Sequence, residues 1–155
     1  MSESPYQHIR IRPGVFVLIR DKMGRYLMLE RSDGHGFEFV KGGAEVGESF
    51  EDAALREIKE EIGMRVTPNN LIELPVTLSF RFPLKEGYEI RIYKGFLIIM
   101  EKIDLEELVL DKFFSSAKLM HLDEASKLIS FPEYYKVMKE VEELSKKIKE
   151  KMRKR

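Results

Sequence analysis

The sequence GGAEVGESFEDAALREIKEEIGM, from Gly42 to Met64, predicts a glycine-rich loop followed by an amphipathic helix. Three glutamates, Glu57, Glu60 and Glu61, are spaced i, i+3 and i+4, which places them on one face of that helix. Ala53 and Met64 share the carboxylate side, and the opposite side carries a stripe expected to face the core, formed by Ala54, Leu55, Ile58 and Ile62. Crowded carboxylates repel one another, and a hard divalent cation would turn this repulsion into coordination.

The spacing of glycine, glutamate and arginine in this stretch carries a family resemblance. Gly42, five residues, Glu48, seven residues, and then Arg56 to Met64 resemble an unbroken Nudix box. The resemblance to MutT-like Nudix hydrolases implies an α/β/α sandwich with a mixed β-sheet and a Mg²⁺ or Mn²⁺ cofactor. It also implies hydrolysis of a nucleoside diphosphate linked to another group, by a water that the metal activates.

The same resemblance assigns roles to the residues of the box. Glu57, Glu60 and Glu61 would be metal ligands, and Glu60 or Glu61 would also orient or deprotonate the water. Glu48 would be an outer ligand or a partner of Arg56, which would position the carboxylates. The backbone carbonyl of Gly42 or Lys41 would be a further ligand.

Two alternatives accompany these assignments. The carboxylates alone would fit a solvated helix face, but the matching Gly42, Glu48, Arg56 and Gly63 favour a metal site. The general base would otherwise come from a later acidic segment, through Glu101, Glu106 or Glu107, although each of these also fits an ordinary acidic loop.

Substrate choice depends on residues outside the box. The segment from Phe37 to Gly43 resembles the family branch that hydrolyses dinucleoside polyphosphates or trims the 5′ triphosphate of RNA, with Val40 in place of a usual proline. Proline and tyrosine markers of other branches are absent at 80–82. Candidate substrate contacts are Lys41, Arg31, Phe37, Phe80, Phe82 and Arg81, where core packing for Phe80 and Phe82 and solvation for the arginines are the alternatives.

We therefore predict a Nudix hydrolase whose substrate is a dinucleoside polyphosphate such as diadenosine tetraphosphate. ADP-ribose or another nucleotide sugar, a (deoxy)nucleoside triphosphate and the 5′ end of RNA are the alternative substrates. A non-catalytic nucleotide-binding module fits less well, because its carboxylates would be degraded.

Composition sets broader limits. The chain has 155 residues, 27 basic against 27 acidic, so no global charge favours nucleic acid or a membrane. It has no cysteine, which excludes disulfides and thiolate metal sites. No apolar run approaches the roughly 18 residues of a membrane span, and no signal-peptide pattern is present, so we expect a cytoplasmic protein.

The basic segment 146–155 would attract RNA or simply end a helix, and the second interpretation is favoured. The resemblance also implies a homodimer as one option.

Hydrophobic periodicity predicts the remaining elements. Strands are expected at 7–11, 15–19, 25–30, 76–82, 88–101 and 113–119, with Pro13 and Gly14 interrupting the first two. Three helices are expected: one that Ser49 caps and that ends at Ile62, one at 123–129, and one from Pro132 to about 152. This order predicts one domain over residues 1–155, with a mixed sheet covered by helices on both faces.

Overall fold

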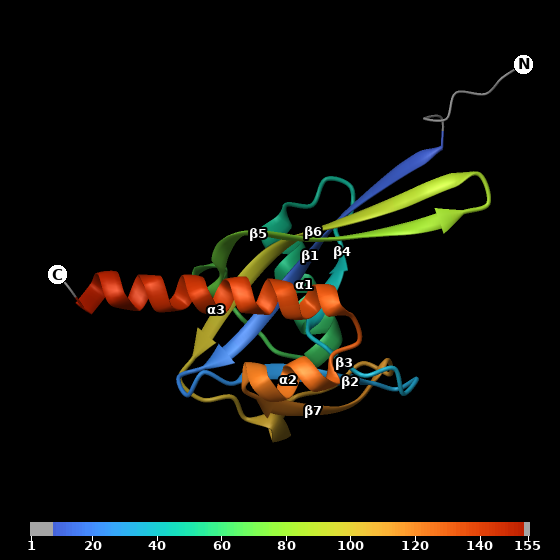
Figure 1. Cartoon of the computed structure of the whole chain (residues 1–155). Helices are drawn as coiled ribbons and strands as arrows, with labels where there is room; N and C mark the ends of the chain where they lie inside the picture. Colours follow the sequence, from blue (N-terminus) through green and yellow to red (C-terminus); the bar gives the residue numbers. More distant parts are fainter. Residues whose placement is uncertain (1–7, 154–155) are drawn as a thin grey trace, which may run out of the picture.

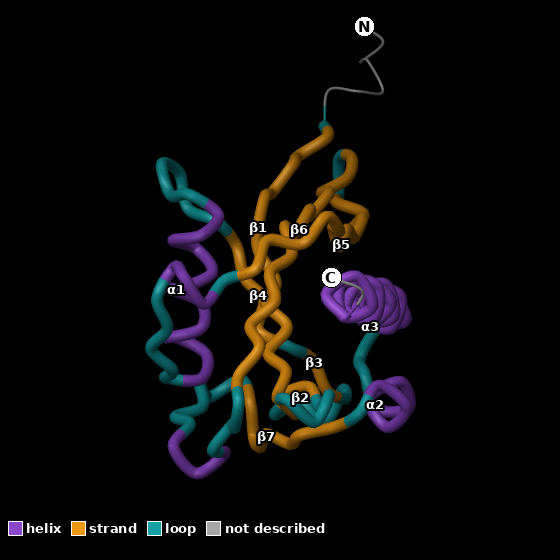
Figure 2. Tube along the Cα trace, turned by 90° about the vertical axis from the view of Figure 1, so that its left-hand side faces the viewer, coloured by secondary structure: helices purple, strands orange, loops and turns teal. Residues whose placement is uncertain are grey.

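A computed structural model describes residues 8–153, and it contains one sheet with helices on both faces (Figure 2). Helix α1 (Phe50–Ile62) covers one face, and α2 (Leu122–Leu128) and α3 (Pro132–Arg153) cover the other. The seven strands are β1 (Ile9–Asp21), β2 (Tyr26–Arg31), β3 (Phe37–Glu38), β4 (Val40–Gly43), β5 (Ile72–Leu84), β6 (Gly87–Met100) and β7 (Phe114–Met120). The predicted α/β/α sandwich is confirmed.

The sheet is mixed, with strand order β3-β2-β1-β6-β5, while β4 also pairs with β1 and β7 with β2. The pairing of β1 with β6 is parallel and runs the whole length of β1, from Ile9 beside Tyr88 to Asp21 beside Met100. Every other pairing is antiparallel.

The predicted break at Pro13 and Gly14 is wrong, because β1 is continuous through both residues. Strand β4 pairs with β1 only from Gly14 onward, so Pro13 lies where one side of β1 has no neighbouring strand and a missing N–H is tolerated. At Gly14, a Cβ would lie 2.6 Å from the Gly42 carbonyl oxygen and 2.7 Å from the Tyr93 ring. Gly14 is therefore required by close packing rather than by a turn.

Alternate side chains of the apolar run in β1 pack into two different hydrophobic cores, one on each face of the sheet. Val15, Val17 and Ile19 belong to the cluster beneath α1, whereas Phe16 and Leu18 belong to the cluster beneath α2 and α3. Successive side chains of a strand point to opposite faces, so a strand buried on both sides reads as a continuous hydrophobic run.

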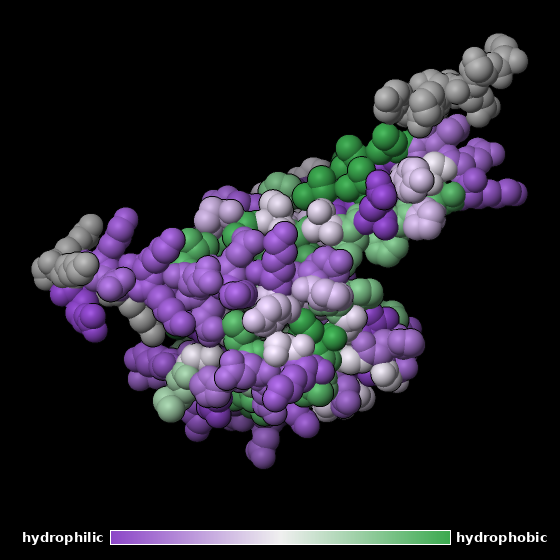
Figure 3. Space-filling model, viewed as in Figure 1, coloured by the Kyte–Doolittle hydropathy of each residue, from purple (hydrophilic) through white to green (hydrophobic). Residues whose placement is uncertain are grey.

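One end of the sheet extends beyond the helices as an arm, formed by residues 9–13 of β1, 81–84 of β5 and 87–92 of β6 (Figure 1). Its exposed apolar residues include Ile9, Ile11, Tyr88 and Ile92, and Figure 3 shows hydrophobic residues gathered along it. The predicted turn at 83–87 is shorter than expected, because β5 continues to Leu84 and β6 begins at Gly87.

The C-terminal part follows the prediction closely. Helix α3 begins at Pro132, and the acidic segment 104–111 contains only the short 3₁₀ turn Leu105–Glu107. Of the predicted basic segment, residues 146–153 lie in α3, and residues 154–155 lie outside the described part of the chain. Within residues 8–153, no helix is both long enough and apolar enough to cross a membrane.

Candidate active site

Helix α1 has the caps that its sequence predicts. The Ser49 hydroxyl accepts a hydrogen bond of 3.0 Å from the Asp52 backbone N–H, and Gly63 ends the helix in the left-handed conformation with φ of 68°. The predicted core stripe needs correction, since Leu55 is only partly buried and Ala53, predicted on the carboxylate side, is fully buried. Because α1 packs on both β1 and β4, its carboxylate face is turned partly into the protein.

Glu57 lies against the backbone of β4. Glu57 is only 9% exposed, and a Cβ at position 42 would overlap its carboxylate. Burial raises the pKa of Glu57, although the neighbouring Arg56 opposes that rise. Gly42 is thus needed because any side chain there would displace Glu57.

Glu61 is hydrogen-bonded to Lys41, the residue that precedes Gly42 in β4. The Lys41 backbone N–H donates a hydrogen bond of 3.0 Å to its Oε2. Burial is the main cause that raises the pKa of Glu61 to about 9. The carboxyl group is therefore protonated near neutral pH until a cation or another positive charge approaches it.

Arg56 holds the acidic groups around it together. Its Nε and Nη2 donate to the two carboxylate oxygens of Glu48 at 2.7 and 2.9 Å, while Nη1 donates to Glu57 at 2.8 Å and to Glu60 at 3.2 Å. Nη2 also donates to the Gly43 carbonyl oxygen at 2.8 Å. The hydrogen bonds that the Arg56 guanidinium donates to Glu48 lower the pKa of this carboxyl group to about 2. Glu48 is thus in place as the predicted partner of Arg56.

Carboxylate oxygens are ligands of the type that a hard divalent cation prefers. Within the described residues, no three acidic or histidine side chains converge closely enough to form a metal site as they stand. Arg56 engages Glu48, Glu57 and Glu60 at once. Glu57 and Glu61 both face β4, where the absence of a side chain at Gly42 makes room for the Glu57 carboxylate. Oxygen donors of this kind suit Mg²⁺ or Mn²⁺.

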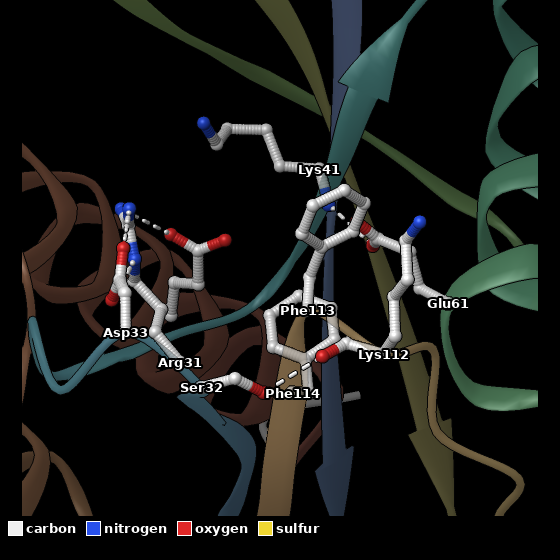
Figure 4. Close-up of a pocket in the computed structure, with 9 residues that line it drawn as sticks. Arg31, Ser32, Asp33, Lys41, Glu61, Lys112, Phe113 and Phe114 are labelled. Carbon is white, nitrogen blue, oxygen red and sulfur yellow. Dashed lines mark hydrogen bonds and ion pairs between the residues drawn. The ribbon is translucent and has the colours of Figure 1, made fainter.

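A cavity of about 470 Å³ opens beside Glu61 (Figure 4). It is lined by Arg31, Ser32, Asp33, Glu38, Lys41, Glu61, Lys112, Phe113 and Phe114. Glu61 therefore belongs both to the carboxylate group on α1 and to this pocket. The three cationic residues suit a phosphate chain, and the side chain of Phe113, which is 66% exposed, offers an aromatic face.

The cations of the pocket are held in different ways. Arg31 pairs with Asp33 at 2.6 Å and with Glu38 at 3.6 Å. The Lys41 ammonium lies among aromatic rings, 4.9 Å from the centre of the Tyr93 ring and 5.7 Å from that of Tyr134. Burial lowers the pKa of Lys41. Both residues line the pocket, in agreement with a phosphate contact, and that role stays a prediction.

The other four predicted substrate contacts do not line this pocket. Phe37 is 6% exposed and packs in the core, which opposes a direct contact with substrate. Phe80 is partly buried against the same core. Phe82 and Arg81 lie on the arm, where the Phe82 ring packs 4.6 Å from the Arg91 guanidinium and Arg81 lies 5.1 Å from the Tyr88 ring.

The alternative general bases are distributed over two segments. Glu101 follows β6 and pairs with Lys22 at 3.2 Å. Glu106 and Glu107 are exposed in the 3₁₀ turn. The segment after that turn is held to the end of α1, because the Val109 and Asp111 N–H groups donate to the Ile62 and Glu61 carbonyl oxygens. None of the three glutamates lines the described pocket.

Sequence reasoning missed Glu38, Lys112 and Phe113 as pocket residues. One signal was available for Phe113, since adjacent Phe113 and Phe114 point to opposite sides of an extended chain and only one can enter the core. Phe114 is the buried member of the pair. Lys112 had no local signal, because its place depends on the packing of β7 against β2.

Comparison with known proteins identifies the family of the chain. A family model described as NUDIX domain matches residues 10–141, and the chain therefore belongs to the Nudix family. The RNA pyrophosphohydrolase of Shewanella frigidimarina is 39% identical over 75 residues, which are 46% of this chain and 42% of that protein. The RNA pyrophosphohydrolase of Pectobacterium carotovorum is 39% identical over 54 residues, covering 35% and 30% of the two chains. The chain thus spans less than half the length of the curated relatives it matches.

Solved structures share the fold at low sequence identity. The E. coli dihydroneopterin triphosphate pyrophosphohydrolase has a TM-score of 0.72 at 22% identity, covering 84% of this chain and 96% of that one. A C. elegans Ap4A hydrolase binary complex has a TM-score of 0.65 at 19% identity, covering 86% and 96%. These likenesses establish the architecture, and the substrates named for them belong to those proteins.

Proposed function

We propose that this Nudix protein is a metal-dependent pyrophosphohydrolase, which cleaves a P–O–P linkage in a nucleoside diphosphate joined to another group. The observation that carries the proposal is the double position of Glu61, which stands among the α1 carboxylates and also lines the cationic pocket. A phosphate chain bound by the pocket would therefore lie beside the group of carboxylates that suits a metal.

Each residue has a distinct task in this proposal. Glu57, Glu60 and Glu61 would hold one or more Mg²⁺ or Mn²⁺ ions, which supply Lewis acidity and a water of lowered pKa. Arg56 would keep Glu57 and Glu60 in position through its two-sided contacts. Arg31 and Lys112 would bind phosphate oxygens, while Glu60 or Glu61 would accept the proton of the attacking water.

Two substrates are favoured by separate observations. The loop before the box favours a dinucleoside polyphosphate, whose extended phosphate chain would use the cations along the pocket. The curated relatives favour the 5′ triphosphate of RNA, since those matched here are named RNA pyrophosphohydrolase. The choice between Mg²⁺ and Mn²⁺, a homodimeric assembly and a cytoplasmic location are further proposals that rest on the sequence.

A product analysis tests the proposal. Purified protein with Mg²⁺ or Mn²⁺ is incubated with diadenosine tetraphosphate, 5′-triphosphorylated RNA, ADP-ribose and nucleoside triphosphates, and products are separated by chromatography. Metal-dependent cleavage of one substrate is expected, and Glu57→Gln should abolish it. Glu51→Gln, an exposed change in the first turn of the same helix, is the matched control and should keep the activity. No turnover of any substrate, with nucleotide still bound, would favour the non-catalytic binding module.

A further inference from the structure

A buried arginine lies near the end of β1, away from the pocket described above. Arg20 is only 5% exposed, and its Nε has no hydrogen-bond partner. Its guanidinium lies 6.0 Å from the centre of the Tyr26 ring, and it opposes the rise that burial causes in the pKa of the Tyr26 hydroxyl. Among the described residues, no carboxylate lies within ion-pair distance of Arg20. A buried charge without a partner is costly, so its environment is expected to supply an anion.

The adjacent carboxylate of Asp21 does not fill this role. It accepts hydrogen bonds of 2.9 Å from the backbone N–H groups of Met23 and Arg25. The Arg25 guanidinium also pairs with it at 2.8 Å. Asp21 is thus used to fix the turn between β1 and β2, and its charge is balanced there.

Arg20 lines a cavity of about 220 Å³ between the ends of β1 and β6 and helix α3. The other lining residues are Asp21, Lys22, Gly24, Ile99, Glu142, Ser145 and Lys146. Lys146 is exposed, Lys22 pairs with Glu101 at 3.2 Å, and the Ser145 hydroxyl donates to the Val141 carbonyl oxygen at 2.9 Å. Two of the lining residues carry carboxylates, Asp21 and Glu142, and the charge of Asp21 is neutralised by Arg25. No residue is shared with the pocket beside Glu61.

We propose that this cavity is a second site, which binds a small phosphate-bearing anion through the Arg20 guanidinium. A guanidinium presents its N–H groups in a planar fork that matches two phosphate oxygens. The cavity has room for a phosphate group with a few waters, since each water occupies about 30 Å³ in the liquid. Lys146 of α3 adds a second cation to the lining, and Glu142 opposes binding by its charge.

A phosphate titration followed by amide NMR shifts tests the site without metal or turnover. Inorganic phosphate should shift the amides of Gly24, Ile99 and Ser145, and Arg20→Met should weaken this response at least about tenfold. Lys139→Met, an exposed change on the same helix outside the cavity, is the matched control. Shifts confined to Asp33, Lys112 and Phe113 would place phosphate only in the first pocket and overturn the proposal.

A second measurement separates an anion site from a hidden ion pair between Arg20 and Glu142. Without phosphate, Arg20→Met and Glu142→Gln should each leave Tm unchanged or raise it, because neither breaks a pair. Glu142→Gln should also tighten phosphate binding. A loss of Tm in both variants, with unchanged phosphate affinity, would show that Glu142 is the partner and would overturn the proposal.

The source of the phosphate group is distinguished by comparing two probes at the same amides. Tighter binding of AMP than of inorganic phosphate would identify a phosphate monoester as the ligand. Equal or weaker binding of AMP would identify the free ion. Either result retains the site, and both should lose their response in Arg20→Met.

Discussion

The backbone N–H of Lys41 donates to the carboxylate of Glu61 across 3.0 Å, so that strand β4 and helix α1 meet at the pocket. The lysine side chain and the glutamate carboxylate are thereby fixed at one site, although twenty positions separate them in the chain. The arrangement of the carboxylates and the pocket therefore depends on how closely β4 and α1 approach each other.

Gly42→Ala should lower kcat/KM by about a hundredfold, because the new methyl group would displace the Glu57 carboxylate. It should also cost roughly 1–3 kcal/mol of stability through overpacking. Gly43→Ala is the matched control, since a Cβ there meets nothing within 4 Å. Steady-state kinetics and urea unfolding of both variants provide the comparison. Equal activity of the two variants would contradict the role given to Gly42.

Arg56→Lys should reduce the apparent metal affinity by about ten- to a hundredfold, although the charge is kept. A single ammonium cannot reproduce the two bonds to Glu48 together with those to Glu57 and the Gly43 carbonyl. Metal titrations of activity would show the change. Arg65→Lys, placed just beyond α1, serves as the control, and a normal metal response in Arg56→Lys would refute the positioning role.

The metal-free protein should lose stability as pH rises from about 4.5 to about 9, owing to Glu61. The folded state keeps the Glu61 proton over this range while the unfolded state releases it, so unfolding becomes more favourable with each step in pH. Denaturant unfolding at several pH values measures this slope, and Glu61→Gln should reduce it. Divalent-ion affinity should rise over the same range, because binding requires the ionised carboxylate. A slope that is unchanged in Glu61→Gln would assign the effect to other groups.

Phe113→Ala should raise KM for nucleotide substrates about tenfold, because base stacking on an aromatic ring contributes roughly 1–3 kcal/mol. Inhibition by inorganic pyrophosphate, which has no base, should stay the same in this variant. Phe82→Ala is a useful comparison, since Phe82 lies on the arm and packs against Arg91. A larger effect from Phe82 than from Phe113 would place the base on the arm instead of in the pocket.

The sequence predicted the fold class and the helix that carries the candidate carboxylates, because both depend on short-range patterns. The spacing of Glu57, Glu60 and Glu61 fixes a helix face whatever surrounds it, and Ser49 and Gly63 mark the ends of that helix. The alternation in the predicted strand 76–82 likewise identifies a buried face through Val76 and Leu78, although Phe82 at its end is exposed. Local periodicity contains this information without reference to the rest of the chain.

The parts that sequence reasoning missed depend on long-range packing. Pro13 appeared to break a strand, yet the pairing of β4 with β1 begins only at Gly14, and the Pro13 carbonyl oxygen still accepts a hydrogen bond from the Ala44 N–H. The pocket combines Arg31 at the end of β2 with Lys112 before β7, and no local pattern links these two residues. Phe37 resembled a substrate contact by its place before the box, but the sheet turns its side chain into the core.

The long parallel pairing of β1 with β6 also bears on how the chain folds. Ile9 lies beside Tyr88 and Asp21 beside Met100, so this pairing forms only after the intervening strands, loops and α1 have been brought together. Closing such a large loop costs entropy before its contacts are gained, and topologies dominated by distant pairings fold slowly. The β5–β6 hairpin and α1 are local and are expected to form first, which leaves the docking of β1 as the late step that completes both cores.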